Sequence, residues 1–174
     1  MKIINILALI LLMLFSSCVK KDEKVEIILD DEIETQMLDS YKKGLKALDD
    51  GDAIYAAKHF TDAELLFPQS DWAPKSLLMA SYSYYSQDYF TDAIAELERF
   101  IRTYPQSNRL DYAYFLLATC YYEKIIDEKK DLKPLLQSKE IFQFIIKEYP
   151  QTDFALDAKF KLDLIDETLA GKEM

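Results

Sequence analysis

Side chains capable of acid–base, nucleophilic or metal chemistry are scattered through this sequence of 174 residues without a catalytic spacing. The single histidine, His59, is expected on a helix surface and has no second histidine with which to build a metal site or a catalytic triad. No glycine-rich phosphate loop, Cys-x-x-Cys, His-Glu-x-x-His or Gly-x-Ser-x-Gly pattern occurs. We therefore expect no catalytic residue, no metal and no cofactor, and a protein that is not an enzyme.

Side chains that suit peptide binding are instead concentrated in the middle of the chain. Nine of the 12 tyrosines lie between Tyr82 and Tyr122, and all three arginines, Arg99, Arg102 and Arg109, fall in the same stretch. Tyrosine offers a large amphipathic contact surface at a small entropic cost. The arginines are candidate polar anchors for a C-terminal carboxylate or an acidic partner. Intramolecular ion pairs are the alternative role for them.

The elements that must position these side chains follow from a recurring aromatic-Pro-Gln-Ser/Thr stretch. Its prolines, Pro68, Pro105 and Pro150, are 37 and 45 residues apart. Small and large apolar residues recur at fixed distances before each proline. These sets are Ala56, Ala93 and Ser138; Phe60, Leu97 and Phe142; Ala63, Phe100 and Ile145; and, further back, Gly44, Ser81 and Ala118. The spacing resembles the tetratricopeptide repeat, in which small residues let two antiparallel helices approach closely and proline ends the second helix.

We therefore predict an all-α tetratricopeptide-repeat solenoid with about three helix pairs plus one further helix. The repeat domain is expected over 39–174, with repeats at about 40–70, 71–107 and 108–152 and a partial repeat at 153–174. A charged insertion at 125–133 lengthens the third repeat, and the lone Cys120 is expected to be a small buried residue.

The N-terminal segment predicts export and lipidation. Residues 1–17 have a short basic start and an apolar run too short to span a membrane, as in a signal peptide. The sequence from Leu14 to Cys18 resembles a bacterial lipobox, which implies acylation of Cys18. Val19, rather than an aspartate, follows it, which implies sorting to the outer membrane. An ordinary secretory signal is the alternative. Residues 18–38 are predicted to be the acylated cysteine and a charged tether.

In tetratricopeptide arrays the first helix of each pair lines a concave face, and the register predicts its outward side chains. The candidate client-binding residues are Tyr41, Leu45, Leu78, Tyr82, Tyr85, Tyr112, Phe115 and Tyr122, accompanied by Leu48 and Thr119. Packing between repeats is the alternative for each tyrosine. The net charge of −10 disfavours a nucleic-acid partner, which would require a basic face.

Four stretches of the chain carry a more specific resemblance. They are the segments 41–45 (YKKGL), 99–105 (RFIRTYP), 110–115 (LDYAYF) and 169–173 (LAGKE). Together with the order of lipobox, tether and repeats, they make the chain similar to the BamD family, lipoproteins of the bacterial β-barrel assembly machinery.

The resemblance implies a lipid-anchored scaffold on the periplasmic face of the outer membrane. Such a scaffold binds unfolded β-barrel outer-membrane proteins, helps deliver them to the BamA insertase, and contacts the BamA POTRA domain and the other lipoproteins of the machinery. One alternative is a periplasmic adaptor for cell-wall synthesis or division proteins. Another is a repeat domain that regulates an enzyme or transporter by contact.

The last stretch, 153–173, predicts a single amphipathic helix whose apolar residues are Phe154, Ala158, Leu162, Ile165 and Leu169. This helix has no second helix to pair with. We therefore expect a fragment or a truncated gene product that lacks the last repeats of a five-repeat family member. In the family, those repeats dock on the POTRA domain.

Overall fold

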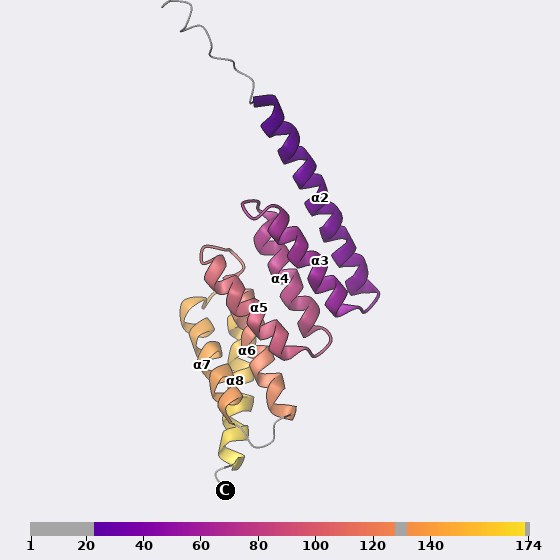
Figure 1. The fold of residues 1–174 in the computed structure, drawn as a ribbon. Helices are drawn as coiled ribbons and strands as arrows, with labels where there is room; N and C mark the ends of the chain where they lie inside the picture. The colour runs from indigo at the N-terminus through magenta and orange to yellow at the C-terminus, as the bar shows by residue number, and fades with distance from the viewer. Residues whose placement is uncertain (1–22, 128–131, 173–174) are drawn as a thin grey trace, which may run out of the picture.

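The computed structural model describes residues 23–127 and 132–172, which are drawn as the coloured ribbon in Figure 1. The helices within these ranges are α2 (Glu23–Asp49), α3 (Ala53–Leu66), α4 (Trp72–Tyr85), α5 (Phe90–Thr103), α6 (Leu110–Asp127), α7 (Lys133–Glu148) and α8 (Asp153–Lys172). None of them combines the length and apolarity needed to cross a membrane. The predicted signal peptide and Cys18 lie outside the described residues.

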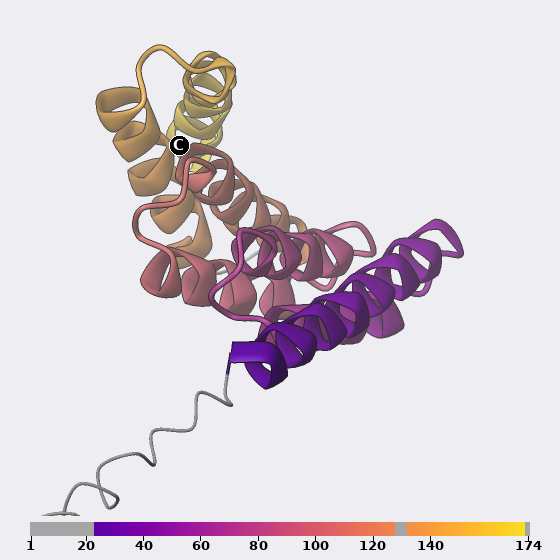
Figure 2. The ribbon, with the colours of Figure 1, turned by 90° about the horizontal axis from the view of Figure 1, so that it is seen from above.

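Consecutive helices pack against each other along the whole array, from α2 on α3 to α7 on α8 (Figures 1 and 2). The first helices of successive pairs also touch, because α4 contacts α6, and α6 contacts α8. The described chain is therefore a stack of three helix pairs and one further helix, as the sequence predicts for an all-α solenoid.

The recurring apolar positions form the core of this stack. Every residue twelve, eight or five positions before a repeat proline has an exposed fraction of 0%, including Phe60, Leu97 and Phe142. The buried side chains divide into three clusters, one for each pair, and each cluster takes in residues of the next first helix, such as Ala80 of α4 in the first cluster and Ala155 of α8 in the third. Each pair therefore completes its core with the helix that follows it.

The aromatic residue before each repeat proline caps the second helix of its pair. Helices α3, α5 and α7 end immediately before Phe67, Tyr104 and Tyr149, because proline disfavours a helical conformation in the preceding residue. The carbonyl of each capping residue accepts a hydrogen bond from the N–H group three residues later, over 3.1, 3.0 and 3.1 Å in chain order. The repeated aromatic-Pro-Gln-Ser/Thr sequence thus forms the same turn three times.

The turns within the pairs contain residues that suit their backbone conformation. Gly51 has a φ of 79°, a left-handed conformation that glycine adopts without strain. Asp52 caps α3 by accepting a hydrogen bond from the backbone N–H of Tyr55 over 3.0 Å. Asp88 has a φ of 62° in the turn between α4 and α5. Pro134 lies in the first turn of α7, where proline is tolerated.

Helix α2 shows that the prediction of a tether over residues 18–38 was wrong from Glu23 onward. The helix begins at Glu23, within the 18–38 segment expected to be flexible, and it runs past the predicted start of the domain at residue 39. Its charged side chains from Asp31 to Glu34 are exposed, whereas Met37 is fully buried in the core cluster of the first pair. The charges lie on the solvent side of an amphipathic helix, so the acidic composition concealed the helical register.

Gly44 offers a test of the close approach within the first pair. A Cβ atom added to Gly44 would lie 2.9 Å from Cδ1 and Cε1 of the Phe60 ring, whereas one added to Gly171 would meet nothing within 4 Å. We expect Gly44→Ala to lower the free energy of unfolding by about 1–3 kcal/mol. Gly171→Ala should leave it unchanged or raise it slightly, because alanine favours a helix. Urea unfolding followed by circular dichroism measures both, and equal midpoints for the two variants would contradict the contact.

Candidate functional site

A hollow of about 540 Å³ lies between the first helices of the second and third pairs, α4 and α6. Three residues that the sequence predicts for the concave face, Leu78, Tyr82 and Tyr112, lie in its wall, and Arg109 joins them from the loop before α6. The other lining residues are Asp71, Pro74, Lys75, Met79, Ser107 and Asn108. Sequence reasoning missed these residues, although extending the α4 register by one turn, from Leu78 to Lys75, would have found part of them.

A second hollow of about 340 Å³ lies between α2 and α4 and shares Tyr82 with the first. Leu45 and Leu48 of α2 line it, and Asp49 lies at the end of α2 beside them. Leu45 and Tyr82 keep 43% and 37% of their surface exposed. We call the two hollows together the concave groove. Tyr82 stands at its centre.

Tyr41 does not line this groove. Its side chain is only 6% exposed, and its ring makes edge-on contacts with Phe60 and Trp72, both at 5.1 Å between centroids. Burial also raises the pKa of the Tyr41 phenol. The expected groove residue is therefore a core residue that fills the space where α2, α3 and α4 meet.

Phe115 and Tyr122 of α6 are likewise drawn away from the groove by packing. The Phe115 ring lies 5.8 Å from that of Phe142 and 5.4 Å from that of Phe154. The ammonium group of Lys161 lies 4.6 Å above the ring of Tyr122. Both Phe154 and Lys161 belong to α8, which covers this face of α6. The sequence did not predict this covering helix as a neighbour of the candidate site.

The side chains of Tyr85 and Thr119 also pack in the interior more than they line the groove. The Tyr85 ring packs on Phe90 at 6.1 Å and belongs to the surroundings of the second core cluster. Thr119 is 6% exposed and donates its hydroxyl hydrogen to the Phe115 carbonyl over 2.9 Å. The open part of the concave face is therefore centred on α4, with α2 and the start of α6 as its borders.

Cationic groups lie at one end of the groove. The Lys75 ammonium lies 4.2 Å above the ring of Trp72 and 5.3 Å from the centroid of Tyr41, close enough for cation–π attraction to hold it. Arg109 also lines the first hollow, and Asp71 is the one carboxylate among its lining residues. Within the described part of the chain, no ion pair of the Arg109 side chain is formed.

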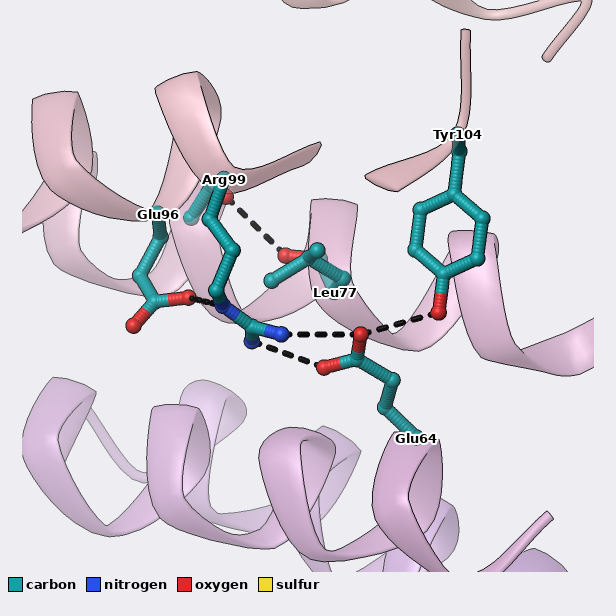
Figure 3. Close-up of polar contacts among 6 residues, drawn as sticks. Glu64, Leu77, Glu96, Arg99 and Tyr104 are labelled. Atoms are coloured by element: carbon teal, nitrogen blue, oxygen red, sulfur yellow. Dashed lines mark hydrogen bonds and ion pairs between the residues drawn. The ribbon is translucent and has the colours of Figure 1, made fainter. Parts of the chain in front are cut away.

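Arg99 is committed to an intramolecular contact between the first two pairs (Figure 3). Its guanidinium donates to both carboxylate oxygens of Glu64, over 2.9 and 2.7 Å, and to Glu96 over 2.9 Å. The Tyr104 hydroxyl donates to Glu64 over 2.9 Å. The Glu64 side chain is 4% exposed and that of Arg99 30%. We call this cluster the Glu64 lock. It leaves Arg102 and Arg109 as the arginines exposed for a partner.

The pKa values of Arg99 and Tyr104 are both raised within the Glu64 lock. Burial lowers the pKa of Arg99, but the hydrogen bonds to Glu64 and Glu96 outweigh it and keep that pKa above its ordinary value. Burial, and then the bond to Glu64, raises the pKa of the Tyr104 phenol well above its usual range. Arg99 is thus charged and Tyr104 neutral at physiological pH, as the hydrogen-bond directions require.

The register positions that form the Glu64 lock carry apolar side chains in the third repeat. Four residues before the proline, Glu64 is matched by Ile101 and Ile146, so a charge at an apolar position was the available sequence signal for the lock. In the third repeat Arg99 is matched by Phe144, which packs on Tyr149 at 6.1 Å and on Tyr114 at 4.7 Å between centroids. A polar lock therefore joins the first pair to the second, whereas the matching positions of the third repeat belong to an aromatic cluster within the third pair.

The candidates for reactive chemistry are buried. His59 is 9% exposed, not on the surface as the sequence suggested, and its ring lies against Tyr55 at 4.4 Å between centroids. Cys120 is fully buried, and burial raises the pKa of its thiol to about 12, which disfavours the nucleophilic thiolate. Among the described residues no group of three metal-ligating side chains converges.

Comparison with known proteins gives one family. The family model described as YfiO, outer membrane lipoprotein, matches residues 33–174. The outer membrane protein assembly factor BamD of Caulobacter vibrioides is 32% identical over 171 residues, which cover 98% of this chain and 55% of that protein. The protein of the same name from Rickettsia prowazekii is 34% identical over 134 residues, covering 77% and 53%. The chain thus spans about half the length of the curated relatives it matches.

Solved structures share the fold at low sequence identity. The first tetratricopeptide domain of human RPAP3 has a TM-score of 0.59 and 18% identity, covering 80% of this chain and 97% of that domain. The tetratricopeptide domain of Arabidopsis OM64 has a TM-score of 0.56 and 14% identity, covering 75% and 97%. These likenesses confirm the tetratricopeptide solenoid.

The Glu64 lock leads us to expect that Glu64→Gln, although nearly isosteric, lowers the free energy of unfolding substantially. Glu64→Gln removes the charge and one acceptor oxygen while keeping the shape, so we expect the free energy of unfolding to fall by about 2–4 kcal/mol. Asp39→Asn breaks the exposed pair of Asp39 and Lys43, which are 2.7 Å apart, and should leave the urea midpoint nearly unchanged. Similar shifts for both variants would show that the lock does not join the first two pairs.

Burial of the Tyr112 phenol leads us to expect that the free energy of unfolding falls as the pH rises through the alkaline range. Burial raises the pKa of its phenol from 10.0 to about 12. Because the folded pKa lies above the unfolded one, the contribution of the neutral phenol is complete below pH 10 and is lost between pH 10 and about 12. The wild type should therefore lose stability relative to Tyr112→Phe across this window, by up to about 1.4 kcal/mol per pH unit. Urea unfolding at several pH values checks this. A difference that stays constant with pH would contradict it.

Proposed function

The chain belongs to the YfiO family of outer membrane lipoproteins, and we propose that it serves as an outer-membrane protein assembly factor. In this role it is a lipid-anchored periplasmic scaffold that binds unfolded β-barrel outer-membrane proteins and helps deliver them to the BamA insertase. The observation that carries the proposal is the family match over residues 33–174, together with relatives named as assembly factors.

The concave groove is the proposed client-binding site. Leu45, Leu78, Tyr82 and Tyr112 give it an apolar and aromatic wall, in which Tyr82 is exposed. An extended peptide can place alternate side chains on such a wall, while the exposed Tyr82 phenol supplies a hydrogen bond to its backbone. An unfolded β-strand sequence, which alternates apolar and polar side chains, has the required pattern.

The proposed anchor is an acyl group on Cys18. Helix α2 begins at Glu23, so residues 19–22 separate this cysteine from the helix. At 1.5 Å per residue the 27 residues of α2 extend for roughly 40 Å. The helix would therefore carry the membrane attachment directly into the first repeat. A single acyl chain binds a bilayer only weakly, so stable attachment requires further acylation of the same residue or a membrane partner.

The proposed partners are the POTRA domain of BamA and the other lipoproteins of the assembly machinery. Since the chain spans about half the length of its relatives, we assign no surface of the described helices to these contacts. The outer membrane and unfolded clients complete the partner set, and no nucleic acid belongs to it.

Affinity purification of the lipidated, tagged protein from detergent-solubilised membranes tests the assembly role. We expect a barrel protein with POTRA domains to be recovered in near-stoichiometric amount, because a scaffold that hands over clients must contact the insertase. The bound proteins are identified by mass spectrometry, and Cys18→Ala serves as the control that should remain unattached to membranes.

Recovery of peptidoglycan synthases or division proteins, without the barrel protein, would overturn the assembly role. The same repeats would then be those of a cell-wall adaptor. That alternative has no support from the relatives, which carry the assembly-factor name.

A further inference from the structure

We propose that the Glu64 lock is a positioning cluster, which fixes the orientation of the first helix pair on the second and so sets the width of the concave groove between α2 and α4. None of its four residues, all of which the structure describes, lines the groove. The lock therefore acts on the groove from a distance, through the helices that carry it. This inference rests on the proposed client-binding function, because the width of the groove matters only to a client that binds there.

The first helices of the first two pairs are held apart on the groove side. Helix α4 packs on α6 and α6 packs on α8, whereas α2 and α4 are not among the described helix pairs that pack closely. Their side chains meet at one end, where the rings of Tyr41 and Trp72 are 5.1 Å apart between centroids. At the other end the hollow lined by Leu45, Leu48 and Tyr82 separates them. Direct packing of α2 on α4 therefore does not set the width of this hollow.

The lock supplies a second point of attachment between the two pairs. Helix α3 packs closely on α4, but one such contact is an interface about which two rigid pairs can rotate. The lock joins α3 to α5, which are also not among the described helix pairs that pack closely. With both attachments in place, rotation of the first pair on the second requires the lock to break.

The hydrogen bonds of the lock suit this positioning role (Figure 3). Arg99 donates to both carboxylate oxygens of Glu64, and such a bidentate pair fixes an angle as well as a distance. Tyr104 donates to the same carboxylate, and Glu96 holds the Arg99 guanidinium. The Glu64 side chain is 4% exposed, so water has little access to its oxygens. Three hydrogen bonds from the second pair thus converge on one carboxylate of the first.

The lock and the hollow between α2 and α4 lie at opposite ends of the helix pairs. Glu64 lies in the last turn of α3 and Tyr104 follows α5, so the lock is at the end that carries the repeat prolines. The hollow is lined by the end of α2 and by Ser86 and Gln87 after α4, at the end that carries the turns within the pairs. Helices α3 and α5 each have 14 residues and extend for roughly 21 Å. A small rotation at the lock therefore becomes a larger displacement at the hollow.

A distance measurement between the pairs tests the positioning role. Spin labels are attached through Lys46→Cys in α2 and Thr91→Cys in α5, two exposed residues that do not line the groove, in a chain that also carries Cys18→Ala. The native Cys120 is fully buried and does not take the label. We expect one narrow distance distribution with the lock intact and a broader one in Glu64→Gln, whose side-chain amide keeps one acceptor oxygen and no charge. Double electron–electron resonance measures both.

The same variants test whether the lock acts on client binding. The probe is a synthetic peptide of alternating aromatic and polar residues. We expect Glu64→Gln to bind it roughly tenfold more weakly, the loss that follows when about one-tenth of the molecules hold the binding orientation. Arg99→Gln should have the same effect. The double variant should bind no more weakly than either single variant, because both substitutions remove the same contact.

A loss of stability elsewhere separates positioning from stability. Phe142→Leu loosens the buried core of the third pair, and Phe142 belongs to α7, which takes no part in the lock. It should lower the thermal midpoint while leaving the distance distribution and the peptide affinity unchanged. If Glu64→Gln does not fold, Tyr104→Phe, which removes one of the hydrogen bonds to Glu64, should give a smaller broadening in a folded protein.

Three outcomes would overturn the inference. If the lock variants keep the narrow distance distribution, the lock does not orient the pairs. If the distribution broadens but the peptide affinity is unchanged, or if Phe142→Leu weakens the peptide equally, the lock does not act on the groove, although client binding stands. If the protein with an intact lock does not bind the peptide, the groove is not the client site, and the client-binding part of the proposed function fails as well.

Discussion

The whole array depends on how closely the two helices of each pair can approach. In the first pair Gly44 lets the Phe60 ring lie where any Cβ atom would collide with it. In the third pair the Ser138 hydroxyl donates directly to the backbone carbonyl of Ala118 over 2.8 Å, which requires the two helices to be nearly in backbone contact. In the second pair the buried Leu97 and Phe100 of α5 belong to one cluster with residues of α4 and α6. The width of the groove between α4 and α6 therefore follows from the packing of α5 behind it.

Much of the fold was predictable because it follows from local spacing. Proline at a fixed distance after small and large apolar residues identifies the helix pairs, and it does so without knowledge of any other contact. The start of α2 was not predicted because the exposed charges near Glu34 dominate the composition, while the burial of Met37 depends on helices that follow later in the chain. The Glu64 lock joins residues 35 and 40 positions apart, a separation at which no local pattern applies.

The candidate site was predicted only in part, for a geometric reason. Register alone shows which residues face away from the partner helix of a pair, and it correctly grouped Leu78, Tyr82 and Tyr112. It does not show how far successive pairs rotate or what covers them. Tyr41 is therefore interior, and Phe115 lies under α8, although all these residues occupy the concave side of the register. That Lys75 and Arg109 line one hollow follows from the packing of successive pairs, which the register does not give.

The Glu64 lock between the first two pairs and the aromatic cluster within the third pair respond differently to temperature and salt. The desolvation cost of an ion pair such as Glu64 with Arg99 falls as temperature rises, whereas contacts such as Phe144 with Tyr149 weaken on cooling. Salt screens charges and leaves aromatic contacts nearly untouched. Cooling is therefore expected to weaken the aromatic contacts of the third pair. High ionic strength is expected to weaken the Glu64 lock between the first and second pairs, although burial of Glu64 limits the screening.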